Sequence, residues 1–257
     1  MYIALYIIIF IGTAGSGKSH LTASFGEWLK LKKQNVNFVN LDPGVISLPY
    51  NPDIDARNYV NIFELMEEFK LGPNGALLMA ADLIADHAEE IKESIYDMGA
   101  DIILVDTPGQ IELFAFRESG PYITGAIAEC PKATVFLFDA PFCKNPLNYV
   151  SNVYLSIAAY TRLIQPQVCA LSKVDLISKP ELENILLWQE DLDNLSESLR
   201  IGGKIEQSLI SEGLIRAITE TGLNIQPIPI SSKLSSGMDE LNAELTRILS
   251  GGEEERP

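Results

Sequence analysis

The amino-acid sequence predicts an α/β protein with a doubly wound, mostly parallel sheet flanked by helices. Two observations predict this class. Short apolar runs alternate along the chain with longer stretches of helical periodicity. A glycine-rich segment also joins the first apolar run to the first helical stretch, an arrangement that binds anions at a helix N-terminus. The class therefore places binding chemistry at the carboxyl ends of the strands.

The expected strands are apolar runs, several of them without polar alternation, as in strands covered on both faces. They are residues 5–11, 36–41, 101–105, 133–139, 167–172 and 226–230. The expected helices lie between the strands or after the last one. They are residues 18–33, 60–70, 76–98, 146–163, 180–221 and 237–249.

The stretch 180–221 is a helical insertion before the last expected strand. It either packs onto the domain or forms a lid or groove that receives a partner segment. We expect a single domain over residues 1–250, followed by a flexible acidic tail at 251–257.

Charge and hydropathy exclude some classes of partner. The formal net charge of −16 argues against direct binding to nucleic acid, which needs clustered Lys and Arg. No stretch approaches the ~20 apolar residues of a membrane-spanning helix, so we expect no membrane partner. Cleaving residues 1–11 as a signal peptide would remove the first strand, so we expect a cytoplasmic location.

The most specific motif follows the first expected strand. It reads Gly12, Thr13, Ala14, Gly15, Ser16, Gly17, Lys18, Ser19. The glycines let backbone N–H groups surround the β- and γ-phosphates, Lys18 brings a cation to them, and the Ser19 hydroxyl can bind Mg²⁺. His20, the next residue, is counted with the nucleotide-binding residues. It is not expected to bind a metal, since no second His or Cys stands at metal-ligand spacing. The motif predicts a nucleoside-triphosphate site rather than an empty glycine-rich turn.

Two further strand ends carry groups for the γ-phosphate and the metal. Asp106 ends the strand 101–105 and can hold Mg²⁺ through its water shell, and the Gly109 N–H can sense the γ-phosphate. Gln110 can orient the attacking water. Asp42 ends the second strand, and it either positions that water or supports Mg²⁺.

The last two strand ends carry groups for a base. The Asp175 carboxylate can accept paired hydrogen bonds from guanine N1–H and its 2-amino group, which adenine does not offer. The stem of Lys173 can pack over the purine plane. Backbone N–H groups of Ser231, Ser232 and Lys233 can reach the guanine O6. These elements, in this order, favour GTP over ATP.

The chain resembles the GPN-loop GTPase family, which is named for a run that stands here as Gly72, Pro73 and Asn74. The resemblance extends over nearly the whole chain. The motifs are Gly-Thr-Ala-Gly-Ser-Gly-Lys-Ser, Asn-Leu-Asp-Pro, Gly-Pro-Asn-Gly, Asp-Thr-Pro-Gly-Gln-Ile-Glu-Leu-Phe, Ser-Lys-Val-Asp and Pro-Ile-Ser-Ser-Lys. Without the resemblance, Gly-Pro-Asn-Gly reads as a turn between helices.

The resemblance implies a single P-loop GTPase domain that binds GTP/GDP and Mg²⁺ and forms a homodimer. The loop of Gly72, Pro73 and Asn74 in one subunit would reach the phosphate site of the other, where the Asn74 amide could donate to a phosphate oxygen. Arg57 is a weaker candidate for such a contact.

The functional expectation is a dimeric switch that hydrolyses GTP to GDP and phosphate. The residues expected to act in catalysis are Lys18, Asp42, Asn74, Asp106 and Gln110. The resemblance suggests a role in assembling a protein complex such as RNA polymerase. The alternative is a P-loop kinase or phosphotransferase acting on a small molecule or a nucleic-acid end, although no basic cluster stands ready for a charged acceptor.

Overall fold

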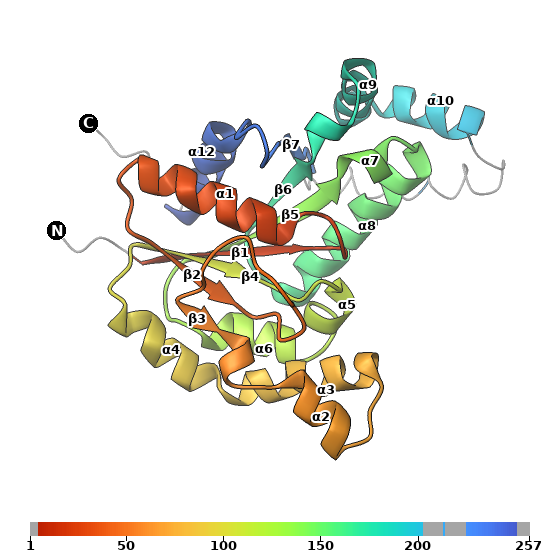
Figure 1. The fold of residues 1–257 in the computed structure, drawn as a ribbon. Coiled ribbons are helices and arrows are strands. Elements are labelled where there is room, and N and C mark those ends of the chain that lie inside the picture. The colour runs from red at the N-terminus through yellow and green to blue at the C-terminus, as the bar shows by residue number, and fades with distance from the viewer. Residues whose placement is uncertain (1–4, 203–212, 214–224, 251–257) are drawn as a thin grey trace.

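The computed structural model describes residues 5–202, 213 and 225–250, and the structural statements that follow concern these residues. They build a seven-stranded sheet in the order β3-β2-β4-β1-β5-β6-β7, with every neighbouring pair parallel (Figure 1). The strands are β1 (Tyr6–Gly12), β2 (Val36–Asn40), β3 (Ile54–Asp55), β4 (Ile102–Asp106), β5 (Lys132–Asp139), β6 (Gln167–Ser172) and β7 (Ile228–Pro229). The predicted fold class is confirmed.

Helices cover both faces of the sheet. On one face lie α1 (Lys18–Leu31) and α12 (Met238–Leu249), and on the other lie α4 (Ala88–Asp97), α6 (Ser119–Ala126) and α8 (Pro146–Leu163) (Figure 1). The apolar run of β1 is buried because both faces of that central strand contact helices.

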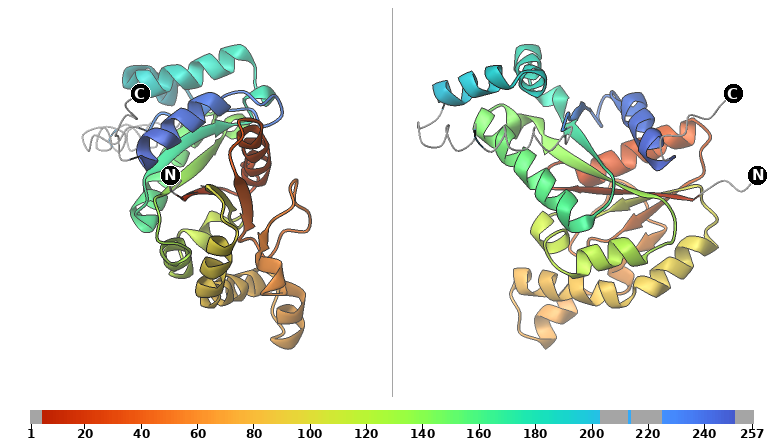
Figure 2. Two further views of the ribbon diagram at one scale, coloured as in Figure 1. Left: turned by 90° about the vertical axis from the view of Figure 1, so that its left-hand side faces the viewer. Right: turned by 180° about the vertical axis from the view of Figure 1, so that it is seen from behind.

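The remaining elements within the described ranges are further helices. They are η1 (Ala56–Asn58), α2 (Ile62–Glu68), α3 (Pro73–Asp86), α5 (Ile111–Phe114), α7 (Ala140–Cys143), η2 (Val174–Leu176), α9 (Lys179–Glu190) and α10 (Leu192–Gly202). Seen from behind, α3, α4 and α6 lie together along one edge of the molecule (Figure 2). Within the described ranges, no helix is both long and apolar enough to cross a membrane.

The prediction of one helix over 76–98 is wrong. The chain leaves the helical conformation at His87 (φ −90°, ψ 9°), where α3 ends and α4 begins. The His87 ring lies against Tyr59, with the ring centroids 5.2 Å apart. Since helical periodicity continues through the break, the sequence pattern does not reveal it. In addition, α3 begins at Pro73 rather than residue 76, because proline is well accommodated in the first turn of a helix.

The described part of the insertion consists of two helices rather than one. Asp191 is extended (φ −135°, ψ 106°) and separates α9 from α10. Its carboxylate accepts hydrogen bonds from the Asp193 N–H at 2.8 Å and the Asn194 side-chain amide at 2.7 Å. Trp188 and Leu195 are buried in the core that contains α8, so this part packs onto the domain. Residues 203–212 and 214–221 of the insertion, and the tail 251–257, lie outside the described residues.

Candidate nucleotide-binding site

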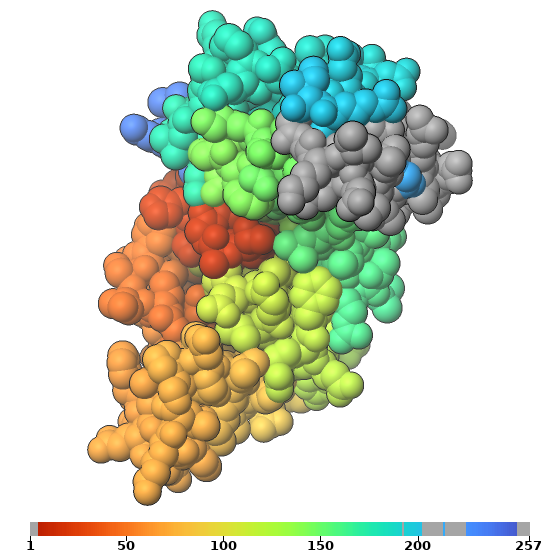
Figure 3. All heavy atoms as spheres, turned by 90° about the vertical axis from the view of Figure 1, so that its right-hand side faces the viewer, coloured from red at the N-terminus to blue at the C-terminus, as the bar shows by residue number. Residues whose placement is uncertain are grey.

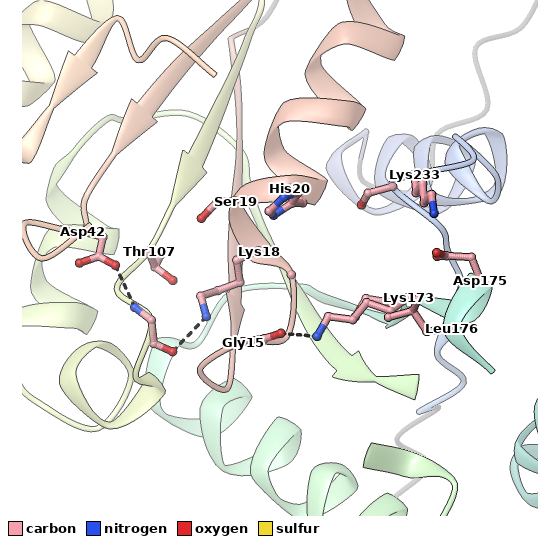
Figure 4. Close-up of a pocket in the computed structure, with 14 residues that line it drawn as sticks. Gly15, Lys18, Ser19, His20, Asp42, Thr107, Lys173, Asp175, Leu176 and Lys233 are labelled. Carbon is pink, nitrogen blue, oxygen red and sulfur yellow. Dashed lines mark hydrogen bonds between the residues drawn. The ribbon is translucent and has the colours of Figure 1, made fainter. Parts of the chain in front are cut away.

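A cleft of about 520 Å³ opens at the carboxyl ends of the strands, where the fold class places ligand chemistry. Figure 3 looks onto this end of the molecule, with the red N-terminal segment at its centre and the gold residues of the α2–α3 region at its lower edge. The lining residues are Gly15, Gly17, Lys18, Ser19, His20, Asp42, Thr107, Gly109, Ser172, Lys173, Asp175, Leu176, Ser232 and Lys233 (Figure 4). The cleft joins strand ends that are far apart in the sequence.

The glycine-rich segment between β1 and α1 requires glycine for backbone reasons. Gly15 (φ 76°) and Gly17 (φ 96°) adopt left-handed conformations that other residues rarely adopt. Gly17 is the N-cap of α1, so the segment delivers the chain directly into the helix. The first-turn N–H groups of a helix have no helical partners, and they form an anion site together with the positive end of the helix dipole.

Lys18 ties the glycine-rich segment to the end of β4. Its ammonium donates to the carbonyls of Gly12 and Thr13, both at 3.0 Å, and of Gly109 at 3.1 Å. The side chain is buried, and burial lowers the pKa of Lys18 to about 8 in spite of the Asp106 and Asp42 charges nearby. Within the part of the chain that the structure describes, neutral carbonyls hold this buried cation, and a phosphate group can supply its counter-anion.

Asp42 accepts a hydrogen bond from the group expected to sense the γ-phosphate, the Gly109 N–H. Its Oδ2 accepts a hydrogen bond from the Gly109 N–H at 3.1 Å (Figure 4). Its Oδ1 accepts one from the Gly44 N–H at 2.8 Å. Burial raises the pKa of Asp42, and these two backbone donors partly offset that effect. The Asn40 side chain fixes the backbone of Asp42, donating to its carbonyl and accepting from its N–H, both at 3.0 Å.

Asp106 is 1% exposed and has one oxygen still available. Its Oδ2 accepts a hydrogen bond from the Tyr50 hydroxyl at 3.1 Å, whereas Oδ1 is buried and has no hydrogen-bond partner among the described residues. Burial raises the pKa of Asp106 to about 6, with the hydroxyls of Ser19 and Tyr50 acting in the opposite direction. Burial and the nearby Asp106 charge also raise the pKa of Tyr50, so its hydroxyl remains a donor.

These groups fit Mg²⁺. Ser19 lines the cleft, and one buried oxygen of Asp106 has no partner among the described residues. Hard oxygen donors of this kind are what Mg²⁺ prefers. Across the described residues, no group of three or more His, Cys, Asp or Glu side chains could hold a metal by itself. An ion here would therefore need phosphate oxygens and water as its remaining ligands.

The opposite end of the cleft is built from the ends of β6 and β7. The Ser231 hydroxyl donates to Asp175 Oδ1 at 2.6 Å, which fixes the carboxylate expected to read guanine. The Lys173 ammonium donates to Asp139 Oδ2 at 2.9 Å and to the Gly15 carbonyl. These contacts hold the Lys173 side chain across the cleft, against the glycine-rich segment (Figure 4).

The cleft brings together most of the residues predicted to bind nucleotide, and a few lie elsewhere. Gly12, Thr13, Ala14, Ser16, Asp106 and Ser231 adjoin the lining residues in the sequence or bond to them without being lining residues themselves. Gln110 is exposed at the N-cap of α5 and is not a lining residue. Asn74 is exposed in the first turn of α3 and is not a lining residue either.

The structure also settles the surroundings of Arg57. Its guanidinium donates to Asp55 Oδ2 at 2.6 Å from one terminal nitrogen, and its Nε contacts both Asp55 oxygens at 3.0 Å. Asp55 also accepts from Asn40, the residue that fixes Asp42. Arg57 therefore belongs to the framework behind Asp42.

Sequence reasoning missed several residues of the site. Thr107, Ser172 and Leu176 line the cleft but were not assigned a role. Ser172 donates to the carbonyls of Ser16 at 2.6 Å and Phe138 at 2.9 Å, which ties the end of β6 to the glycine-rich segment. Thr107 and Ser172 stand inside motifs that were recognised, so their position was a usable signal.

Comparisons with known proteins agree with this geometry. A family model described as "Conserved hypothetical ATP binding protein" matches residues 10–250. The chain is 34% identical over 237 residues to GPN-loop GTPase PAB0955 of Pyrococcus abyssi, covering 91% of this chain and 94% of that protein. It is 32% identical over 236 residues to GPN-loop GTPase 1 of Dictyostelium discoideum, covering 91% of this chain and 59% of that protein. The crystal structure of PAB0955, described as a GTPase in apo form, superposes with a TM-score of 0.85 at 32% identity, covering 96% of this chain and 98% of that one.

Proposed function

The chain belongs to the GPN-loop GTPase family, and on this premise we propose that it works as a Mg²⁺-dependent homodimeric switch. GTP hydrolysis and guanine-nucleotide binding follow from membership of the family. The switch, the metal, the dimer and the client are the parts that we propose. The observation that carries the switch is the contact of both Lys18 and Asp42 with the backbone of Gly109.

That contact couples three segments to the nucleotide. A γ-phosphate would compete with the Gly109 carbonyl for Lys18. It would also compete with the Asp42 carboxylate for the Gly109 N–H, and the two anions would repel each other. Binding of GTP would then release Asp42 from Gly109, and loss of phosphate would restore the bond. The equilibrium shifts only as far as the nucleotide binds one arrangement better than the other.

The chemistry is in-line attack of water on the γ-phosphate. Lys18 and the amides of the glycine-rich segment stabilise the charge that develops on the phosphate oxygens. Ser19 would hold Mg²⁺ directly and Asp106 would hold it through water, and the ion would neutralise phosphate charge. Asp42 and Gln110 are the candidates to position the attacking water. Asp42 already lines the cleft, whereas Gln110 would have to turn inward.

Support for a homodimer comes from an exposed region of the chain around α2 and α3. Gly72, Pro73 and Asn74 are exposed at the start of α3. Two large apolar side chains are also exposed, Phe63 of α2 at 76% and Ile46, between β2 and β3, at 92%. A second copy would cover such side chains and bring Asn74 to the partner's phosphate site.

The dimer is tested by sedimentation of the full chain with GDP and with a non-hydrolysable GTP analogue. We expect a dimer with the analogue, and we expect Phe63→Asp to weaken it while Phe142→Asp, which also changes an exposed phenylalanine, leaves it intact. A monomer in both nucleotide states, at concentrations where GTP is hydrolysed at full rate, would overturn the homodimer.

The proposed role is assistance to the assembly of a protein complex such as RNA polymerase, in the cytoplasm, and it rests on the family alone. Capture of partners from the source lysate, run in parallel with GDP and with the GTP analogue, tests it. Proteins enriched in one nucleotide state would identify the client. An identical and sparse set in both states would contradict the assembly role. GTP turnover that required an added acceptor would instead favour the kinase alternative.

A further inference from the structure

Tyr50 lies in the segment between β2 and β3, outside every recognised motif, yet it contacts the metal side of the cleft. Its ring packs on Phe38 of β2, with centroids 5.0 Å apart. Its hydroxyl donates to Asp106 Oδ2 at the end of β4, at 3.1 Å. Because β2 and β4 are neighbouring strands, with Phe38 opposite Leu104 and Asn40 opposite Asp106, one tyrosine can span both contacts.

The framework around Tyr50 fixes where its ring can lie. The Phe38 N–H donates to Asp53 Oδ2 at 2.7 Å, and the Asp53 N–H donates to the Phe38 carbonyl at 2.8 Å. These two hydrogen bonds close the base of the segment. The Phe38 ring also fills the space beside Gly26 of α1, where a Cβ would lie 2.3 Å from a ring carbon. The backbone of Phe38 is therefore held by Asp53 and its ring by α1, so the ring of Tyr50 rests on a fixed surface.

The two oxygens of Asp106 have different surroundings. Tyr50 occupies Oδ2 with a neutral donor, whereas Oδ1 is buried without a partner among the described residues. A donor on one oxygen restricts rotation of the carboxylate and leaves the other oxygen in a defined direction. Groups behind a metal-binding side chain act in this way on the ligands they support.

We infer that Tyr50 is a positioning residue for the divalent ion of the nucleotide complex. Its hydroxyl holds the Asp106 carboxylate so that Oδ1 faces the water shell of Mg²⁺. The inference rests on the proposed Mg²⁺-dependent function. It also assigns a second task to the segment between β2 and β3, which carries both Asp42 on the γ-phosphate side and Tyr50 on the metal side.

The test is Tyr50→Phe in the full chain, which removes the hydroxyl and keeps the ring on Phe38. The readout is the affinity of Mn²⁺ for the protein–GDP complex, measured by electron paramagnetic resonance titration of the free ion. We expect Mn²⁺ binding to weaken about tenfold, with GDP affinity in EDTA unchanged. In GTP hydrolysis, the Mg²⁺ concentration for half-maximal rate should rise by a similar factor, and high Mg²⁺ should largely restore the rate.

Tyr96→Phe is the matched control. It also removes a tyrosine hydroxyl from a hydrogen bond, here one accepted from the Glu129 N–H at 2.8 Å, on a residue of α4 outside the cleft. Equal Mn²⁺ affinity in Tyr50→Phe, Tyr96→Phe and the unchanged protein would overturn the role of Tyr50 and leave the proposed function standing. Failure of the unchanged protein–GDP complex to bind Mn²⁺ would overturn both.

Discussion

The two ends of the cleft handle their ligand in different ways. At the phosphate end, Lys18 and Asp106 are buried, at 5% and 1% exposure. Burial lowers the pKa of Lys18 and raises the pKa of Asp106, so in both it favours the neutral form. At the base end, Lys173 and Asp175 remain partly exposed, and each is held by one or two polar contacts. Charge is thus concentrated out of water at one end and presented to water at the other.

The difference suits the two tasks. A charge acts more strongly on a developing phosphate charge in a low-dielectric site, so burial at the phosphate end favours rate. Selection of a base needs donors and acceptors that match one purine and that are left unpaired, once the bound purine excludes water, by the other. Changes at the phosphate end should therefore alter turnover, and changes at the base end should alter selectivity.

The largest effect is expected for Lys18→Met. Removing the buried ammonium takes away the cation that stabilises the transferred phosphate, and GTP hydrolysis should fall by about a thousandfold or more. Steady-state phosphate release measures this loss. Lys32→Met, just beyond the same helix at an exposed position, should hydrolyse GTP at the unchanged rate. A Lys18→Met protein that keeps a tenth of the activity would break the contrast.

Gln110→Leu should slow hydrolysis by about a hundredfold through loss of the group that orients water. GTP affinity should change little, so the protein would accumulate in the GTP-bound form. Single-turnover hydrolysis and an equilibrium titration with a fluorescent GTP analogue separate the two quantities. Gln34→Leu is an exposed control. Hydrolysis at the normal rate in Gln110→Leu would contradict this role and indicate that Asp42 positions the attacking water.

Asp175→Asn tests the base end. Loss of the carboxylate should reduce the preference for GTP over ATP by roughly ten- to hundredfold, because charge-assisted hydrogen bonds to guanine are replaced by neutral or mismatched ones. Competition between GTP and ATP for the site measures the preference. Asp239→Asn, exposed on α12, should leave it unchanged. If discrimination in Asp175→Asn equals that of the parent protein, the base is read elsewhere.

A smaller effect, on stability, comes from the framework behind Asp42. Burial of Asp55 opposes its ionisation, yet hydrogen bonds from Arg57 and Asn40 prevail and hold the pKa of Asp55 below its usual value. Asp55→Asn should lower the free energy of unfolding by about 2 kcal/mol at pH 7. A pKa that folding lowers stabilises the fold at pH values above the pKa of the unfolded state, about 3.9. The difference in stability between Asp55→Asn and the parent protein should therefore shrink as the pH falls below that pKa. It should vanish once the pH is below the pKa of Asp55 in the folded state.

Urea unfolding at pH 7 and at low pH checks that prediction. Asp82→Asn provides the contrast, because Asp82 also pairs with an arginine, Arg117, at 2.6 Å, but its side chain is 50% exposed. This exposed pair should contribute less than about 1 kcal/mol. Equal losses of unfolding free energy in Asp55→Asn and Asp82→Asn would show that burial does not strengthen the pair of Asp55 and Arg57.

The sequence predicted the fold class and most strand ends because buried parallel strands are continuous apolar runs. It missed β3, which has two residues, and the break at His87, since neither changes a local pattern. Tertiary contacts set both.

The candidate site also contains some residues that the sequence predicted and others that it did not. Residues inside a strand-end motif, such as Lys18 and Asp175, were found because the chemistry dictates their types and spacing. Tyr50 was missed because its role depends on two neighbouring strands that are distant in the sequence. The contact of Asp42 with Gly109 likewise joins two motifs, and only the folded chain brings them together.

The most direct test of the central claim is the ratio of kcat/KM for GTP and ATP, measured on the full chain with Mg²⁺ and no added acceptor. The two-ended cleft predicts release of GDP and phosphate from GTP, with ATP used at least about a hundredfold less efficiently. Equal use of ATP would contradict the assignment of the base end, and no turnover of GTP without an acceptor would contradict hydrolysis at the phosphate end.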